Sequence, residues 1–306
     1  ETSFTQLSLS PDGKKLALIA HGEVFAVSAK DGGAAQRISH SVAAEGEVTW
    51  TPDSRAIVYA SERGLDSHLV RYDFDKGAEE ALTAGAGLDA VPTVSPDGRM
   101  VAYVHGAREL HVLTLAAGGK PARDVVVYAG PFGDEHPPLA WSPDSQWLAF
   151  TLVDRKSFRN VNVIPAAGGA PRPISFLANG QTGGAIAWSP DGKFVLFDTA
   201  QRSEDARMVR IDLLPHVPRY REDAFRDLFK PGQTPERPAD APQPPAKDSA
   251  GGDEDKAGKE GGADKAKKAR PAPVKIVFDG IRERASILPL GMDAEAPVIS
   301  PDGKTL

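Results

Sequence analysis

Hydrophobic residues lie in short blocks along this chain, and a recurring polar phrase separates neighbouring blocks. Six copies of the phrase are present: LSLSPDGKKLALI from Leu7, VTWTPDSRAIVYA from Val48, PTVSPDGRMVAYV from Pro92, AWSPDSQWLAFTL from Ala140, IAWSPDGKFVLFD from Ile186 and PVISPDGKTL from Pro297. In each copy the proline presets the φ angle for the second position of a type I turn, and the following aspartate can accept hydrogen bonds from nearby backbone N–H groups. The pattern therefore predicts a strand, a tight turn and a second strand in every copy.

The residue after the aspartate needs a positive φ angle so that the second strand leaves in register, and glycine adopts such an angle at no steric cost. Four copies place glycine there: Gly13, Gly98, Gly192 and Gly303. Ser54 and Ser145 replace it in the other two copies. We expect each serine to cost up to ~1 kcal/mol, which the turn tolerates.

The blocks that follow the turn are apolar at successive positions, as in AIVYA from Ala56 and MVAYV from Met100. Simple alternation would predict a sheet with one wet face, whereas these strands are predicted to be covered on both faces. A third strand-like stretch comes next, such as HLVRYDF from His68, and a glycine-rich turn leads to a fourth, such as AQRISH from Ala35. Each unit is therefore predicted to hold four strands.

The spacing of the phrase identifies the architecture. The first four intervals between successive turn prolines are 41, 44, 47 and 47 residues, and the last is 111. A period in the mid-forties is the length of one four-stranded propeller blade. We predict an all-β fold, a β-propeller of about five blades plus the start of a sixth; a two-sheet sandwich would need no such period. One position on each innermost strand is predicted to pack at a blade junction rather than to stack on a ligand: Leu9, Trp50, Val94, Trp141, Trp188 and Ile299.

The pattern breaks after residues 1–213, which hold the first blades and the first part of the fifth. Residues 214–230 contain one apolar stripe, formed by Tyr220, Phe225, Leu228 and Phe229, after a proline suited to start a helix. They are predicted to form an amphipathic helical insertion. This helix can lie against the side of the propeller or contact a neighbouring domain.

Residues 231–273 contain no Val, Ile, Leu, Met or aromatic residue, and eight acidic residues balance eight basic ones. Such a segment cannot bury enough apolar surface to offset its ordering entropy, so it is predicted to be a disordered, low-complexity linker that can be deleted without loss of folding. Strand-like alternation is expected to return from Val274. The 111-residue interval then represents one blade with a long excursion between its outer strands, and residues 274–306 complete blade 5 and begin blade 6.

Composition narrows the class of protein. The 306 residues are 41% hydrophobic and 25% charged, as in an ordinary globular protein, and the net charge of −6 argues against nucleic acid as a partner. No apolar run is long enough to span a membrane. The absence of cysteine excludes disulfides, thiolate metal sites and a cysteine nucleophile in this chain, but leaves the compartment open. Because the sequence starts at Glu1 and ends within a copy of the phrase, we expect it to be part of a longer protein, from which a signal peptide can have been removed.

No motif for catalysis or for a cofactor is present. The sequence lacks a Gly-x-Ser-x-Gly elbow, a His-Glu-x-x-His pair and a P-loop. The stretches DFDKG from Asp73 and DEDKAGKE from Asp253 do not have the spacing of a calcium loop. The histidines have no metal-ligand spacing and are interpreted as turn or surface residues: His21, His40, His68, His105, His111, His136 and His216. We therefore assign no catalytic residue, no metal site and no cofactor, and the substrate-binding residues stay unknown.

Two polar stretches are candidate sites. GPFGDEHPP gathers Asp134, Glu135 and His136 between blades, but catalysis would need a second group that the sequence does not identify. Arg155 and Arg159 can point into a channel and meet carboxylates, or they can lie at an exposed hairpin tip.

The repeated SPDGK-apolar phrase resembles the propeller repeats of periplasmic TolB, of tricorn-type serine peptidases and of several exported hydrolases. The interrupted blade, and above all IVFDGIRER from Ile276 to Arg284, looks like the propeller region of bacterial tricorn-like peptidases. That resemblance implies a non-catalytic propeller that guides and size-filters peptides or unfolded chains for a serine peptidase core, with a PDZ-like module beside it. It also implies a homo-oligomeric assembly and a periplasmic or secreted location, a cytoplasmic one being the alternative.

Two other interpretations remain open. The chain can be a TolB-like module that binds another protein and has no attached enzyme. It can also belong to a different hydrolase, either of the prolyl-oligopeptidase type with an α/β-hydrolase core or an amidohydrolase with a metal-dependent barrel. Whether the parent protein is an enzyme therefore depends on sequence outside this chain.

Overall fold

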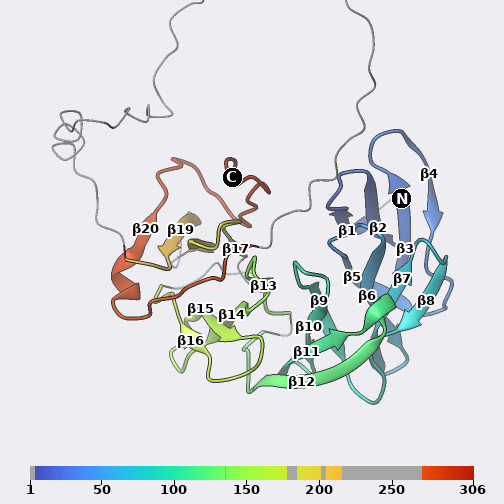
Figure 1. Ribbon diagram of the computed structural model, residues 1–306, viewed down its shortest axis with the longest axis horizontal. Coiled ribbons are helices and arrows are strands. Elements are labelled where there is room, and N and C mark those ends of the chain that lie inside the picture. Colours follow the sequence, from blue (N-terminus) through green and yellow to red (C-terminus); the bar gives the residue numbers. More distant parts are fainter. Residues whose placement is uncertain (1–3, 135, 178–184, 201–204, 216–270) are drawn as a thin grey trace, which may run out of the picture. The chain divides into compact units, whose positions relative to one another are not determined.

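The computed structural model describes residues 4–134, 136–177, 185–200, 205–215 and 271–306. The apolar stripe predicted to form a helix, and nearly all of the predicted linker, lie outside the described residues. The described part contains five separate sheets, each of four antiparallel strands (Figure 1). The predicted four-stranded blades are therefore confirmed.

The blades follow chain order. Blade 1 contains β1 (Phe4–Leu9), β2 (Lys15–Ala20), β3 (Glu23–Ser28) and β4 (Gly32–Arg37). Blade 2 contains β5 (Ala44–Trp50), β6 (Ala56–Arg63), β7 (Asp66–Asp73) and β8 (Ala78–Ala81). Blade 3 contains β9 (Asp89–Val94), β10 (Met100–His105), β11 (Glu109–Leu115) and β12 (Pro121–Ala129). Blade 4 contains β13 (Leu139–Trp141), β14 (Trp147–Val153), β15 (Arg159–Pro165) and β16 (Arg172–Pro173). Blade 5 contains β17 (Ile186–Trp188), β18 (Phe194–Thr199), β19 (Arg207–Asp212) and β20 (Ala285–Ile287).

Helical structure in the described residues is limited to two short 3₁₀ turns, η1 (Ala117–Gly119) and η2 (Ile281–Arg284). None of the described helices has the length and apolar character that crossing a bilayer requires.

The repeated phrase forms the predicted turn. In the first copy, Ser10 Oγ donates to Asp12 Oδ1 at 2.6 Å and accepts the Lys15 N–H at 2.9 Å, while Asp12 Oδ1 accepts the Lys14 N–H at 3.1 Å. The same contacts recur in the copies that contain Thr51, Ser95, Ser142 and Ser300. The residue after the aspartate has a φ angle between 59° and 70° in all six copies, including both serines. The phrase therefore builds the scaffold.

Tryptophans join neighbouring innermost strands. The indole N–H of Trp50 donates to the Ser8 carbonyl at 3.0 Å, that of Trp141 to Thr93 at 2.9 Å, and that of Trp188 to Ala140 at 3.1 Å. All three tryptophans are buried, which confirms their predicted place at the blade junctions.

Leu9 is the exception to this pattern, because 56% of it is exposed. The junction position packs against the preceding blade, and the described residues form no blade before the first. The prediction of a buried Leu9 was therefore wrong for the described part of the chain.

Apolar side chains fill the spaces between blades. One cluster joins blades 1 and 2 through Ile19 and Tyr59, a second joins blades 2 and 3, and two more join blades 3 to 5. Strands that are apolar on both faces are thus covered on both faces, as their sequence predicted.

Blade 5 closes across the long interval. Its outer strand β20 pairs with β19, with Ile287 opposite Val209. The two ends of the interval also meet, since the Val277 N–H donates to the Leu213 carbonyl at 3.0 Å. One blade with a long excursion between its outer strands is therefore what the structure contains.

The expected alternating strands from Val274 onward are mostly absent. Of residues 274–287, only Ala285–Ile287 form a strand. Val274 and Ile281 instead pack into the apolar cluster of blades 4 and 5, and Phe278 lies beside Trp147 and beneath the guanidinium of Arg172, which is 3.5 Å from the ring centroid. The alternation reflected one-sided burial against an existing core and not a hydrogen-bonded ladder.

Candidate functional site

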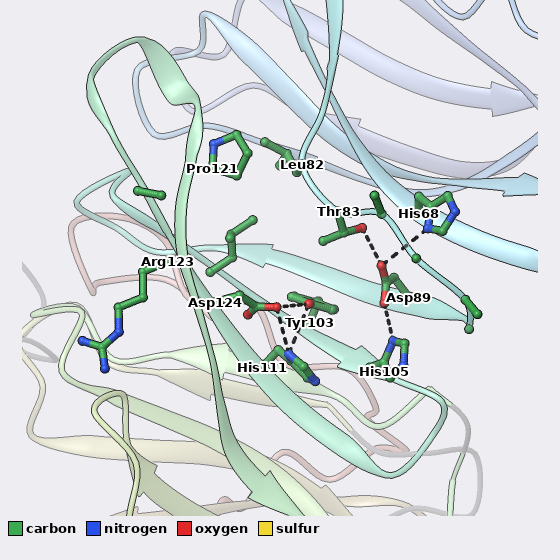
Figure 2. Close-up of a pocket in the computed structure, with 16 residues that line it drawn as sticks. His68, Leu82, Thr83, Asp89, Tyr103, His105, His111, Pro121, Arg123 and Asp124 are labelled. Atoms are coloured by element: carbon green, nitrogen blue, oxygen red, sulfur yellow. Dashed lines mark hydrogen bonds and ion pairs between the residues drawn. The ribbon is translucent and has the colours of Figure 1, made fainter.

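One candidate site is a cleft between blades 2 and 3, with a volume of about 470 Å³. One wall is formed by residues 82–87 of the connection from β8 to β9, by Asp89 at the start of β9 and by His68 of β7. The opposite wall comes from β10, β11 and β12 of blade 3 (Figure 2). We refer to this cavity as the 2–3 cleft.

Asp89 holds one end of the 2–3 cleft together. Its Oδ2 accepts the Thr83 hydroxyl at 2.5 Å, and its Oδ1 lies 2.7 Å from His105 Nδ1. His68 Nδ1 lies 4.0 Å from Asp89 Oδ2, too far for a hydrogen bond, and this buried nitrogen has no hydrogen-bond partner among the described residues. Because Asp89 is only 4% exposed, its charge depends on these neighbours for stabilisation.

A second polar group lies further along the strands of blade 3. The Tyr103 hydroxyl donates to Asp124 Oδ2 at 2.6 Å, and His111 Nδ1 lies 3.0 Å from the same oxygen. Burial, followed by the hydrogen bond to Asp124, raises the pKa of Tyr103 far above its usual value, so its hydroxyl stays a donor. The Nε2 of His111 faces Glu109 Oε2 at 3.2 Å, which places a carboxylate at each ring nitrogen.

The wall opposite blade 3 needs its glycines. Gly85 and Gly87 have φ angles of +120° and +122°, which side chains rarely allow. A Cβ on Gly87 would lie 2.5 Å from His105 Cε1. The backbone is fixed at this point because the Gly87 N–H donates to Asp66 at 2.8 Å and its carbonyl accepts from Ser67 at 2.9 Å. The sequence thus allows the chain to lie directly against His105.

The equivalent positions of other blades are filled differently. His105 is the ninth residue after its turn proline, a position that holds Ala20, Ser61, Leu152 or Thr199 in the other four blades. His111 lies opposite Tyr103, whereas Val70 lies opposite the equivalent Tyr59 of blade 2. Blade 2 keeps a matching tyrosine–carboxylate pair, since the Tyr59 hydroxyl donates to Glu79 at 2.7 Å. The two histidines are what distinguishes the 2–3 cleft.

The polar stretches singled out in the sequence meet elsewhere, at the junction of blades 2, 3 and 4. Asp134 pairs with Arg159 at 3.2 Å, and His136 Nε2 lies 3.4 Å from Glu47 Oε1. Arg155 is exposed at the hairpin tip before β15, and Glu135 lies outside the described residues. The structure therefore brings Asp134 to Arg159 and supplies His136 with a carboxylate that sequence reasoning had not identified.

Glu47 connects two innermost strands. Its Oε2 accepts the Val91 N–H at 2.5 Å, and both residues have positive φ angles, +57° and +55°. Burial raises the pKa of the Glu47 carboxyl. These contacts make Glu47 a tie between β5 and β9.

Sequence reasoning missed the convergence of His68, His105 and His111. They come from three strands, and their common cavity depends on how blade 2 packs against blade 3. A comparison of the blades position by position would have marked His105 as unusual, but nothing in the sequence pairs it with Asp89. Across the described residues, no three histidine, aspartate or glutamate side chains are placed to hold a metal ion.

The chemistry of the 2–3 cleft favours binding over reaction. Because a carboxylate only accepts, His105 Nδ1 donates to Asp89, and in the neutral imidazole Nε2 is then an acceptor. The nearest hydroxyls, of Thr83 and Tyr103, already donate to carboxylates. No serine hydroxyl in the described part of the chain lies against the free nitrogen of His105, so the arrangement has a base but no nucleophile.

Comparison with known proteins supports the fold. Residues 5–140 match the family model described as the TolB beta propeller domain. An uncharacterized protein of Agrobacterium fabrum is 28% identical over 155 residues, which are 47% of this chain and 50% of that protein. This chain thus spans half the length of that relative.

Solved structures show the same architecture at low identity. The putative TolB from Agrobacterium tumefaciens is similar with a TM-score of 0.54 and 18% identity, over 69% of this chain and 78% of that one. The tricorn protease is similar with a TM-score of 0.58 and 14% identity, over 97% of this chain and 26% of that one. With the five blades, these likenesses lead to one conclusion: the chain has a β-propeller fold, of which residues 5–140 match the TolB beta propeller domain.

Proposed function

We propose that this chain is the non-catalytic propeller of a tricorn-like serine peptidase, in which it guides peptides to a catalytic core and excludes folded proteins. The observation that carries the proposal is the extent of the likeness to the tricorn protease, which covers 97% of this chain, against 69% for the putative TolB. Under this proposal the chemistry is acyl transfer by a serine in another part of the protein.

The geometry of the innermost strands supports a role in guiding peptides. The strands β1, β5, β9, β13 and β17 each lie at the edge of a sheet and pair with a single strand. In a propeller these edges surround the central channel, and an extended peptide can bond to free backbone groups on such an edge. Side chains already satisfy part of the edge, because Gln6 accepts the Val48 N–H and Glu47 accepts the Val91 N–H. These two hydrogen bonds leave fewer free backbone groups on the edges, so a peptide can pass along them without being held at every residue.

The proposal includes a setting and partners. The substrates are oligopeptides or unfolded chains, the PDZ-like and peptidase modules belong to the same assembly, and that assembly is a homo-oligomer. The location is the periplasm or the exterior of the cell. No nucleic acid takes part, which agrees with the net charge of −6.

The proposal is tested on the full-length protein with a fluorophosphonate probe, which labels active serine hydrolases. We expect labelling, and cleavage of an unfolded protein such as casein at a rate far above that of a stably folded substrate. Labelling without this preference would reject the filter. A lack of both labelling and cleavage would reject the peptidase and leave the TolB-like binding module as the explanation.

A further inference from the structure

We infer that the 2–3 cleft is a binding site for a ligand that carries an ammonium or guanidinium group. The inference does not depend on the peptidase proposal, because the cleft lies between two blades and its walls come from outer as well as inner strands. A propeller that binds proteins without any enzyme would contain the same site.

Two blades can pack against each other without a cavity lined by polar side chains, so the 2–3 cleft is not explained by packing alone. Apolar clusters join the described blades, blades 2 and 3 included, but the junction of blades 2 and 3 also contains a cavity, and a cavity at such a place costs stability. Blade 3 instead places His105 and His111 at positions where blade 2 has Ser61 and Val70. A cavity of about 470 Å³ has the size of a small-ligand site, in which a few polar groups lie among apolar ones.

Several side chains of the cleft offer acceptors. The hydroxyls of Thr83 and Tyr103 are used as donors to Asp89 and Asp124. His105 donates from Nδ1 to a carboxylate, and in the neutral imidazole its Nε2 is then an acceptor. Asp124 receives both of its hydrogen bonds on Oδ2, and no described residue donates to Oδ1. A ligand rich in N–H donors matches these acceptors.

His68 provides an independent observation. Its Nδ1 is buried without a hydrogen-bond partner among the described residues, and it lines the cleft beside Asp89. Buried polar atoms are nearly always satisfied in folded proteins, so an orphaned nitrogen at a cavity indicates a missing partner.

The charges around the cleft also favour a cation. Asp89 and Asp124 line it, and the single arginine of its lining, Arg123, is exposed and points away from both carboxylates in Figure 2. An ammonium or guanidinium ion would form charge-assisted hydrogen bonds with these acceptors. Two sources present this group, a lysine or arginine side chain of a peptide and a free small amine.

Isothermal titration calorimetry on the full-length protein distinguishes these sources with four probes. The probes are N-acetyl-lysine-methylamide, N-acetyl-arginine-methylamide, free cadaverine, and N-acetyl-norleucine-methylamide as the uncharged counterpart of the first. We expect binding of a charged probe and none of the norleucine probe. Binding of the lysyl or arginyl probe identifies a peptide side chain as the ligand, and binding of cadaverine alone identifies a free amine. If no charged probe binds at millimolar concentration, or if the norleucine probe binds equally well, the inference is wrong.

Variants place the binding in the cleft. Asp124→Asn should lower the affinity for the charged probe by ~10-fold or more, since it removes a charge-assisted hydrogen bond. His105→Gln should also lower this affinity. Glu79→Gln is the matched control, because it changes the same charge and the equivalent tyrosine–carboxylate pair in blade 2 but does not line the cleft. An equal loss in Asp124→Asn and Glu79→Gln, with His105→Gln unchanged, would show that binding occurs elsewhere.

Discussion

The two serines at glycine positions of the turn show how a local strain is offset by a contact with the preceding blade. Ser54 and Ser145 keep the positive φ angle of the turn, at 59° and 61°. The Ser54 Oγ accepts the Asp12 N–H of blade 1 at 3.0 Å, and the Ser145 Oγ accepts the Asp97 N–H of blade 3 at 3.2 Å. Both serines are buried, so these bonds replace water. The expected cost of the substitution is thus compensated by a link between blades that glycine cannot make.

Replacing Ser54 separates the two effects. Ser54→Ala keeps the strained backbone and loses the hydrogen bond, so we expect it to lower the free energy of unfolding by ~1 kcal/mol or more. Ser54→Gly loses the bond but relieves the backbone, so its net change should lie within ~0.5 kcal/mol. Chemical denaturation of the three proteins measures both values. Equal destabilisation by alanine and glycine would contradict the compensation.

The buried carboxyl of Glu45, near the start of β5, makes the stability of the fold depend on pH. Burial raises its pKa, although Ser41 donates to Oε1 at 2.6 Å, and Oε2 is buried without a donor among the described residues. A carboxyl whose pKa is raised on folding holds its proton more tightly in the folded state. It therefore carries no penalty below the unfolded pKa of about 4.3 and destabilises the fold as the pH rises through the folded pKa.

The variant Glu45→Gln should remove this penalty. We expect the free energy of unfolding at pH 7 to rise by ~1 kcal/mol and the value near pH 4 to change little. Thermal unfolding across this pH range gives the comparison, and the exposed Glu283→Gln serves as a control that should show no such trend. A stability gain that grows toward low pH would have the wrong sign and refute the assignment.

At the scale of strands, the indole hydrogen bonds join one blade to the next. Trp188 donates to the Ala140 carbonyl at 3.1 Å from a buried position. We expect Trp188→Phe to lower the free energy of unfolding by ~1–2 kcal/mol, because it leaves that carbonyl without its donor and removes apolar volume. Trp147→Phe is the control, since the Trp147 indole donates to no described residue. If both variants lose the same amount, the hydrogen bond contributes nothing beyond packing.

The hairpins and the blade period could be predicted because they depend on local chemistry that is repeated along the chain. The proline, aspartate and glycine of each turn act within a few residues of one another, and the period follows by counting. Val274 to Arg284 could not be assigned in this way, because alternating burial looks the same whether a segment pairs with a strand or packs across the edge of two blades. The histidines of the 2–3 cleft were missed for a related reason, since Asp89 and His105 meet only after β9 pairs with β10 and blade 2 covers them.

At the scale of the whole molecule, the long interval within blade 5 behaves as an insertion between two strands that are already fixed. Its described ends meet on the propeller: the Leu213 carbonyl accepts the Val277 N–H at 3.0 Å and the Arg284 guanidinium at 3.4 Å. The Val274 N–H also donates to Asp144 of blade 4 at 2.6 Å. The pairing of β20 with β19 therefore has support of its own, independent of the residues that lie between.

Removal of residues 231–269 should consequently leave the thermal midpoint of unfolding within about 2 °C of that of the parent protein. A loss of ~1 kcal/mol in the free energy of unfolding would shift the midpoint by more than this. The composition of this segment supports the same outcome, because it contains no large apolar side chain whose burial could stabilise the propeller. The matched variant is Arg284→Ala in the undeleted chain, which removes the contact to the Leu213 carbonyl and should lower the midpoint measurably. If the deletion lowers the midpoint more than Arg284→Ala does, the inserted residues themselves stabilise blade 5, and the closure of this blade cannot rest on the contacts at Leu213 alone.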